Sequence, residues 1–310
     1  MNKINKTYLV VALLFSNLLW ANFDAEGAKK ETPLTFATFN IRNFDHDPRS
    51  GVETNKTEMA KIINSFDFDL LAIQEVVARD TFEKFFSENF PKLNYKLTDC
   101  GGRGHQKLGF IYNPEKLKLI SFNEEPRIAI DSDCHSGIRP GAFAIFETKK
   151  KERFLAIALH LKAGGKQENN DMRFAQMNIL HDILKEYRTQ GVVNFVIMGD
   201  LNTTDYIKKN KNHTRFVDFV KANNLYDSAE KTACSAYWSG GVSDGKEYSS
   251  ILDHILISKN FIGDEKKSSV NINVHSHCAQ VACAAVPAAN LGESYRGVSD
   301  HCPVTFSFKK

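Results

Sequence analysis

The feature that most constrains the fold is a series of short apolar runs, each followed closely by polar or charged residues. Runs of this length are typical of β-strands. The Leu-Leu-Ala-Ile stretch at residues 70–73 shows no polar alternation, which indicates a strand buried on both faces and a sheet covered by further layers. The predicted strands are Leu34–Asn40, Asp69–Gln74, Leu108–Tyr112, Asn194–Gly199, Ile251–Ser258 and Pro303–Phe308.

Amphipathic stretches lie between these strands. The strongest, Asn170–Arg188, places its apolar residues on one side of a helix. Two further apolar runs, Ala142–Thr148 and Arg153–His160, flank a charged turn and predict a β-hairpin. Helices and strands do not alternate strictly, which favours an α+β layered sandwich over a doubly wound sheet. Further predictions are helices at Glu53–Phe66, Thr81–Phe90 and His213–Ala222, and a long loop at Gly263–Val298.

The first 21 residues have the pattern of a cleaved signal peptide. Lys3 and Lys6 precede a short apolar run, Tyr8–Trp20, which is shorter than the ~20 residues of a membrane span. We therefore expect a secreted or periplasmic protein whose residues 22–310 form a single domain. Loss of the two lysines leaves 38 basic and 37 acidic residues, a net charge of +1. Binding to a polyanion would then need locally concentrated basic groups or a bound cation.

Six cysteines in an exported chain permit up to three disulfides in 15 pairings. Cys278 and Cys283 are close enough in sequence to close a local loop, and Cys100 with Cys134 is a reasonable second pair. For Cys302, a buried free thiol is the simpler alternative. The chain has no CxxC pair, so nothing indicates structural zinc.

Polar residues capable of metal binding or proton transfer end or follow five of the apolar runs. Glu75 directly follows a buried strand, where a carboxylate is costly unless it is paired or metal-bound. Each residue alone also has a simpler interpretation, such as a turn asparagine, a core histidine or a surface ion pair. The residues are Asn40, Glu75, His160, Asp200 with Asn202, and Asp300 with His301; Asp253 with His254 forms a second acid–imidazole pair.

Taken in order, these segments resemble the endonuclease/exonuclease/phosphatase superfamily, which has the DNase I-like fold. The segments are FNIRNF, AIQEV, ALHLK, GDLN, LDHI and SDH, and the resemblance runs from Leu34 to Phe308. It implies a four-layer sandwich in which two mixed β-sheets pack face to face and are flanked by helices. The opening FNIRNF is most similar to secreted DNase I-type nucleases.

The resemblance implies a role for each residue in hydrolysis of a phosphodiester. Glu75, Asn40 and Asp300 would bind Mg²⁺ or Mn²⁺, with Ca²⁺ left open. His301 would be the general base, oriented by Asp253. Asp200 and Asn202 would position the water and the phosphate, and His160 would bond a phosphate oxygen or protonate the leaving group. Arg139 and Arg42 would contact the substrate phosphate, whereas Arg173 and Gln176 are interpreted as structural.

The chain also departs from the DNase I pattern. Gly104 and Gln106 stand where DNase I-type enzymes carry a tyrosine that touches DNA and a glutamate that supports the catalytic histidine. This puts close contact with the DNA groove in doubt. It also leaves His160 without a carboxylate partner, a place that Gln106 could take by hydrogen bonding.

We expect a DNA endonuclease of little sequence specificity, acting as a monomer without stable membrane association. Basic residues after Asn202 could contact backbone phosphates: Lys208, Lys209, Lys211, His213 and Arg215. A sphingomyelinase-type phospholipase is the alternative, but it would need an exposed aromatic hairpin, and the apolar stretch Cys278–Leu291 lacks Trp and Phe. A non-catalytic binding module would have lost catalytic positions, and all of them are present.

Overall fold

Two six-stranded mixed β-sheets form the centre of the computed structural model, which describes residues 34–46, 53–130, 133–263 and 270–308. The predicted signal peptide lies outside the described residues. In the first sheet the order is β13-β15-β1-β2-β4-β3, and in the second β5-β6-β7-β8-β12-β9. β1 and β2 are parallel, as are β7 and β8, and the other pairs are antiparallel.

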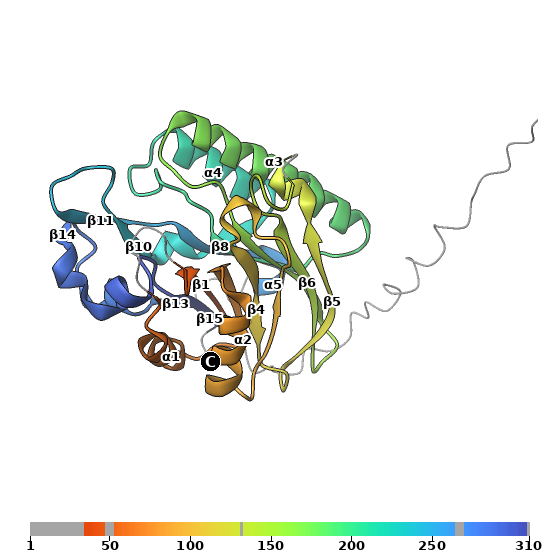
Figure 1. The fold of residues 1–310 in the computed structure, drawn as a ribbon. Helices are drawn as coiled ribbons and strands as arrows, with labels where there is room; N and C mark the ends of the chain where they lie inside the picture. The colour runs from red at the N-terminus through yellow and green to blue at the C-terminus, as the bar shows by residue number, and fades with distance from the viewer. Residues whose placement is uncertain (1–33, 47–52, 131–132, 264–269, 309–310) are drawn as a thin grey trace, which may run out of the picture.

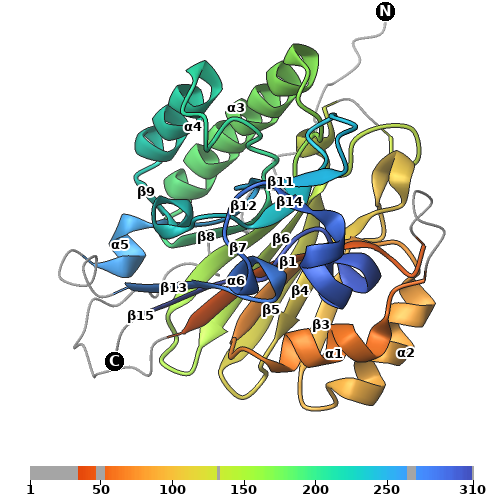
Figure 2. The same ribbon diagram turned by 90° about the vertical axis from the view of Figure 1, so that its left-hand side faces the viewer.

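The first sheet consists of β1 (Thr35–Phe44), β2 (Leu70–Val76), β3 (Asn94–Leu97), β4 (Lys107–Tyr112), β13 (Val270–Val274) and β15 (Val304–Phe308). The second consists of β5 (Leu117–Glu125), β6 (Gly141–Thr148), β7 (Arg153–His160), β8 (Phe195–Asp200), β9 (Leu225–Asp227) and β12 (Asp253–Ser258). A small sheet of β10 (Ala236–Trp238), β11 (Lys246–Ser250) and β14 (Val286–Pro287) lies at one end of the sandwich (Figures 1 and 2).

The two large sheets pack face to face. Their shared core is aromatic: the Phe36 and Phe154 rings meet edge-on at 5.8 Å, and Phe110 and Phe146 do the same. The central strands are buried on this shared face, and their opposite faces are covered as well. Burial on both faces explains why their sequences are continuous apolar runs.

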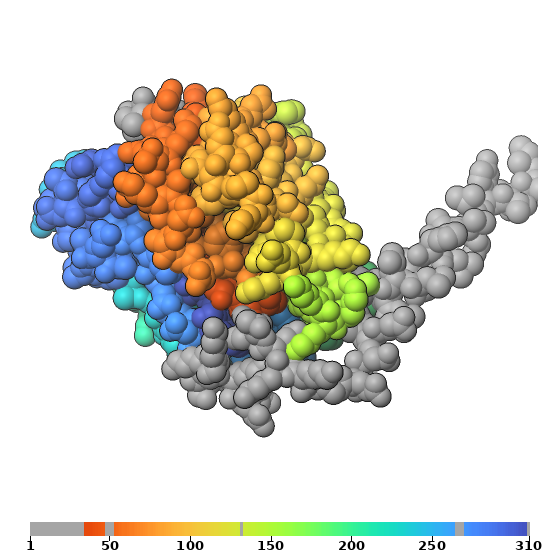
Figure 3. Space-filling view, turned by 90° about the horizontal axis from the view of Figure 1, so that it is seen from below, coloured from red at the N-terminus to blue at the C-terminus, as the bar shows by residue number. Residues whose placement is uncertain are grey.

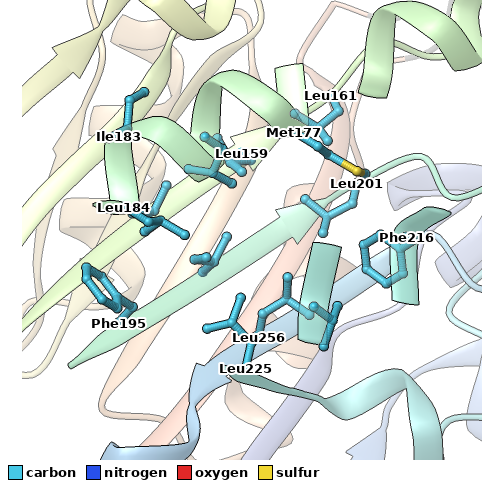
Figure 4. Packing of buried hydrophobic residues seen from close by; sticks show 14 of the residues in the cluster. Leu159, Leu161, Met177, Ile183, Leu184, Phe195, Leu201, Phe216, Leu225 and Leu256 are labelled. Atoms are coloured by element: carbon cyan, nitrogen blue, oxygen red, sulfur yellow. The ribbon is translucent and has the colours of Figure 1, made fainter. Parts of the chain in front are cut away.

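Helices cover the two outer faces, so the fold has four layers (Figure 1). α1 (Lys56–Asn64) and α2 (Arg79–Asn89) cover the first sheet and dominate the face seen in Figure 3. α3 (Gln167–Thr189) and α4 (Lys211–Ala222) cover the second sheet, where Met177, Leu184 and Phe216 pack on the strands (Figure 4). Local signals fix the helix starts; for example, the Asn55 side chain accepts a hydrogen bond from the Glu58 amide and caps α1. Among the described residues, no helix is both long and apolar enough to cross a membrane.

The predicted layered α+β sandwich is confirmed, and so is the hairpin, in which β6 pairs antiparallel with β7. The loop prediction for Gly263–Val298 was wrong in part. The segment contains β13, α6 (His277–Gln280), β14 and two short helical turns, η5 (Ala288–Leu291) and η6 (Ser294–Val298). These elements are too short to leave a hydrophobic period that a sequence can show.

Three disulfides are present, and only one has the predicted pairing. Cys100 pairs with Cys134 as expected. Cys283 pairs with Cys234, and Cys278 pairs with Cys302, so the local Cys278–Cys283 pair and the free Cys302 thiol were both wrong. The two unexpected bonds hold the Cys278–Cys283 segment against β10 and the start of β15, where a small separate core surrounds Tyr237.

Candidate active site

Strand register brings three predicted residues into one row. His160, at the end of β7, lies opposite Asp200, the last residue of β8. Asp253, the first residue of β12, lies opposite Asp200 on its other side. The close approach of β7 and β8 depends on Gly199. A Cβ there would lie 1.9 Å from the Leu159 carbonyl oxygen, and the φ angle of +144° favours glycine. The row therefore places an imidazole and two carboxylates at one end of three adjacent inner strands of the second sheet.

Asp200 is the centre of the site. Its Oδ2 lies 3.1 Å from Asn40 Nδ2, 3.4 Å from His160 Nε2 and 3.6 Å from His301 Nε2. Its Oδ1 accepts a hydrogen bond from the Asn202 amide. Burial raises the pKa of Asp200 to about 7, and the neighbouring carboxylates of Asp253 and Glu75 add to this rise, while His301 opposes it. The buried Asp200 carboxylate thus lies against the rings of His160 and His301 and against the side-chain amide of Asn40, which belongs to the first sheet.

His301 and Asp253 form a buried acid–imidazole pair. His301 Nδ1 lies 2.9 Å from Asp253 Oδ2, which also accepts a 2.8 Å hydrogen bond from the Ser235 hydroxyl. Burial by itself lowers the pKa of His301, but Asp253 and Asp200 overcome this effect and hold it well above its ordinary value. The ring is therefore fixed through Nδ1, and its Nε2 faces Asp200.

Glu75 and Asn40 come from the parallel pair β2 and β1. Asn40 Nδ2 donates to Glu75 Oε1 at 3.0 Å, and the Asn43 amide donates to Glu75 Oε2 at 2.8 Å. Glu75 has a φ of +69°, an unfavourable backbone conformation for a side chain of this size. Strain of this kind at a polar cluster is a common property of functional sites.

The site collects buried negative charge that is well suited to a divalent cation. Glu75, His160 and Asp200 offer ligand atoms within 4.8 Å of one another, and Asp200, Asp253 and His301 form a second such group. Hard divalent cations prefer carboxylate and amide oxygens. A bound cation would also offset the cost that burial imposes on the Asp200 carboxylate. The carboxylate oxygens of Glu75 and Asp200 therefore fit a Mg²⁺-type ion, while Asn40 faces both carboxylates with Nδ2 and accepts from the Arg42 amide with Oδ1.

His160 is buried and held differently from the prediction. Gln106 does not support it, because the Gln106 amide donates to Asn43 Oδ1 at 2.7 Å. His160 Nδ1 has no hydrogen-bond partner among the described residues and lies 3.7 Å from Glu75 Oε1. Burial lowers the pKa of His160 well below its ordinary value, and the positive charges of Arg139 and His301 add to this effect. The ring is therefore neutral near pH 7 and has an unused nitrogen.

Arg139 and Asn202 also lie at the site. Arg139 Nη1 donates to the His160 carbonyl at 3.3 Å. Burial lowers its pKa, while Glu75 and Asp200 oppose this, so the guanidinium is within electrostatic range of both carboxylates. Asn202 Nδ2 donates to the Leu161 carbonyl, which ties together the loops that follow β7 and β8.

Three predicted residues are absent from both groups of ligand atoms, although Asp300 is close enough to help raise the pKa of His301. Asp300 belongs to neither group of ligand atoms, and its carbonyl accepts from the Tyr237 amide. The Arg42 guanidinium donates to the carbonyls of Tyr295 and Arg296, which ties β1 to the 294–298 turn. His254 is fully buried between Asp227 and Thr203 and does not form a pair with Asp253.

Other contacts clarify residues outside the cluster. Ser235, which the sequence did not indicate, holds Asp253, and no motif marks it. Arg173 donates to the carbonyls of Lys162 and Gly164, and Gln176 accepts from the Lys162 amide, as the structural interpretation expects. In the basic segment after Asn202, Arg215 packs over the Phe174 ring and pairs with Asp171, so it is engaged within the protein.

A sequence model of the Endonuclease/Exonuclease/phosphatase family matches residues 37–301. Solved structures share the fold at low identity. The human Nocturnin catalytic domain is 16% identical, with a TM-score of 0.60, over 89% of this chain and 94% of that chain. TDP2 of D. rerio, complexed with single strand DNA product, is 12% identical, with a TM-score of 0.61, over 90% of this chain and 100% of that chain. A mannosyl-6-phosphatase of Bacteroides thetaiotaomicron is 18% identical, with a TM-score of 0.56, over 88% of this chain and 98% of that chain. Among curated protein sequences, none matches significantly.

Proposed function

The chain belongs to the endonuclease/exonuclease/phosphatase family, whose members hydrolyse phosphodiesters or phosphate esters, and we propose that it is an exported, divalent-metal-dependent phosphodiesterase that cleaves DNA with little sequence specificity. The observation that carries this proposal is the convergence on Asp200 of two imidazoles and of the Asn40–Glu75 pair. These groups offer a base, a cation site and phosphate contacts within one buried cluster.

Hydrolysis of a phosphodiester needs an activated water, stabilised charge on the phosphate oxygens and help for the leaving oxygen. His301 takes the proton of the attacking water at Nε2, because its Nδ1 is occupied by Asp253. Asp253 fixes the ring orientation and stabilises the imidazolium that forms. Asp200 and Asn202 orient the water and the phosphate from the side of the second sheet.

Glu75 and Asp200 would hold the cation, with Asn40 beside both carboxylates. When bound, a Mg²⁺ or Mn²⁺ ion supplies a Lewis acid for the phosphate oxygens. The neutral His160 donates a hydrogen bond to a phosphate oxygen or to the leaving group. Arg139 adds a positive charge beside both carboxylates and binds a non-bridging oxygen.

Two observations support DNA as substrate and export as destination. TDP2 of D. rerio, a structural neighbour, is complexed with single strand DNA product. Three disulfides among the described residues are typical of an oxidising compartment, in agreement with the predicted signal peptide. Because the neighbours also include a mannosyl-6-phosphatase, phosphomonoesters are the competing substrate class to be tested.

The test compares four substrates with purified protein in Mg²⁺ and in EDTA: plasmid DNA, bis(4-nitrophenyl) phosphate, 4-nitrophenyl phosphate and sphingomyelin. We expect metal-dependent nicking of the plasmid and hydrolysis of the small diester, both lost in Glu75→Gln. Glu115→Gln, an exposed carboxylate on the β4–β5 turn, is the matched control and should retain activity. Intact plasmid with rapid hydrolysis of the monoester or of sphingomyelin would refute the nuclease proposal.

A further inference from the structure

Two surface loops beside the active site are joined into one unit, called here the lip. It consists of residues 100–106 and 133–139, and the Cys100–Cys134 disulfide connects them. The Arg103 amide also donates to the Gly137 carbonyl at 2.9 Å. A Cβ at Gly102 would lie 2.6 Å from the same oxygen, so the two backbones are in direct contact. The lip is therefore cross-linked by covalent and backbone contacts.

The lip is attached directly to the catalytic cluster. Gln106 donates to Asn43 Oδ1, and the Asn43 amide in turn donates to Glu75 Oε2. At the other loop, Arg139 Nη1 donates to the carbonyl of His160. Each loop thus ends on a residue that contacts the site, and the exposed part of the lip stands at its margin.

The exposed charged or titratable side chains of the lip are three basic residues and one acidic residue, Asp133. Arg103, His105 and His135 are exposed, and the two imidazole rings lie 6.4 Å apart. Within the described part of the chain, the Arg103 side chain makes no hydrogen bond or ion pair. The acidic groups nearby have other partners: Asp133 accepts from the amides of His135 and Ser136, and Asp99 pairs with Arg79. Among the residues that the structure describes, none takes up the five donors of this exposed guanidinium.

We propose that the lip binds a backbone phosphate of a nucleic acid strand, next to the phosphodiester that is cleaved, through Arg103 with His105 and His135. This inference rests on the proposed phosphodiesterase function and assigns it a polymeric substrate, because a small phosphate ester has no second phosphate to reach the lip. Guanidinium groups bind phosphate oxygens through paired hydrogen bonds. Phosphates repeat at about 3.4 Å of rise along each strand of a duplex, so a strand held at the site has further phosphates near the lip.

The composition of the lip favours a nucleic acid over a lipid surface. The large exposed hydrophobic residues of the described chain are Met172, Val193, Ile207 and Val242, and none of them is in the lip. A membrane-binding loop would need apolar side chains to enter the bilayer interface. A charged rim without them fits contact with a phosphate backbone, which carries no sequence information.

The test measures binding separately from catalysis. Anisotropy of a fluorescent single-stranded oligonucleotide is titrated with the full protein in EDTA at several salt concentrations. We expect Arg103→Gln to raise the Kd about fivefold to tenfold and to lower the slope of log Kd against log salt by roughly 0.7, the value for one lost phosphate contact on a single strand. Lys92→Gln, which removes an exposed charge beyond the far end of α2, is the matched control and should leave both unchanged.

A double variant, Cys100→Ser with Cys134→Ser, tests the cross-link, and we expect weaker oligonucleotide binding because the lip is no longer held. Equal Kd and equal salt slope for Arg103→Gln and Lys92→Gln would overturn the lip proposal. Oligonucleotide binding that depends on Arg103, without hydrolysis of any diester, would support the lip and refute the proposed function. Plasmid cleavage together with oligonucleotide binding that is indifferent to Arg103 would support the proposed function and refute the lip.

Discussion

Replacement of Asp200 by asparagine should stabilise the metal-free protein at pH 8 while it removes activity. In the fold, burial raises the pKa of Asp200 from 3.8 to about 7. A rise of roughly three units costs about 4 kcal/mol of stability once the carboxylate is ionised, since each unit corresponds to about 1.4 kcal/mol. Asparagine has no such cost, but it loses the acceptor that Asp200 offers to Asn40 Nδ2, which is worth about 1–2 kcal/mol. The expected net gain at pH 8 is about 2 kcal/mol.

The sign of the pH dependence follows from the raised pKa. Below 3.8 the carboxyl is protonated in both folded and unfolded states, so the penalty is absent. It grows as the pH rises, because the unfolded chain releases the proton before the folded one does, and it is complete above about 7. The stability of Asp200→Asn relative to the wild type should therefore increase from about pH 4 to about pH 7 and then level off.

The assay is urea unfolding in EDTA, followed by far-UV circular dichroism at pH 4.5, 6 and 8 with the disulfides oxidised. Asp99→Asn is the control, because the Asp99 side chain is 95% exposed and its removal should change stability by less than about 0.5 kcal/mol. Added Mg²⁺ should stabilise the wild type more than Asp200→Asn, since only the wild type has the full set of oxygens. A variant that gains no stability relative to the wild type between pH 4.5 and pH 8 would refute the electrostatic reasoning.

The raised pKa of His301 predicts that the kcat/KM of the wild type rises with pH until this pKa is passed. In a pH–rate profile, Asp253→Asn should move this rising limb to lower pH and reduce the rate by about 10²–10⁴. The stability contributed by this ion pair is fully present below the ordinary histidine pKa and is lost as the pH rises through the raised one; a variant with an unmoved limb would contradict the pairing. In thermal unfolding, Glu75→Gln should abolish the Mg²⁺-dependent rise in Tm that Glu115→Gln retains, and an equal rise in both would exclude Glu75 as a ligand. Gly199→Ala should cost more than about 3 kcal/mol in urea unfolding, because its Cβ would overlap the facing carbonyl of β7; a loss below about 1 kcal/mol would show that the strands separate easily.

The ends of the strands were predictable from the sequence. A polar residue directly after a buried apolar run must lie at the edge of a sheet, since it cannot remain inside the core without a partner. Glu75 and Asp200 were found in this way, and both lie in the cluster. Gly199 was predictable for the same reason, because it interrupts an apolar run directly before the acid.

The partners of these residues were not predictable from adjacency. Asp253 and His254 are neighbours in sequence, but successive side chains of a strand point to opposite faces. His254 enters the layer between β12 and α4, where its ring lies 4.8 Å from that of Phe216. Asp253 faces the other way and pairs with His301. Asp300 and His301 are also neighbours in sequence, but only His301 belongs to the ligand group with Asp200 and Asp253.

The disulfides show a further limit of the sequence. Cys278 is five residues from Cys283 but pairs with Cys302, which is 24 residues away. Short elements between Val270 and Val298 turn the chain back on itself, and they carry too few residues to show a period. Loop closure over such distances differs little in entropy, so the packed structure selects the pairing.

By itself, the sequence determined the apolar runs, the layered class that buries them and the polar residues that end them, because these follow from local periodicity and the cost of burying charge. Only the tertiary structure decided that Asp200 contacts imidazoles from two distant segments of the chain, that Ser235 holds Asp253, and that Gln106 bonds Asn43 and not His160. These contacts depend on strand register and on the relative placement of two sheets, which long-range packing sets and no local pattern records.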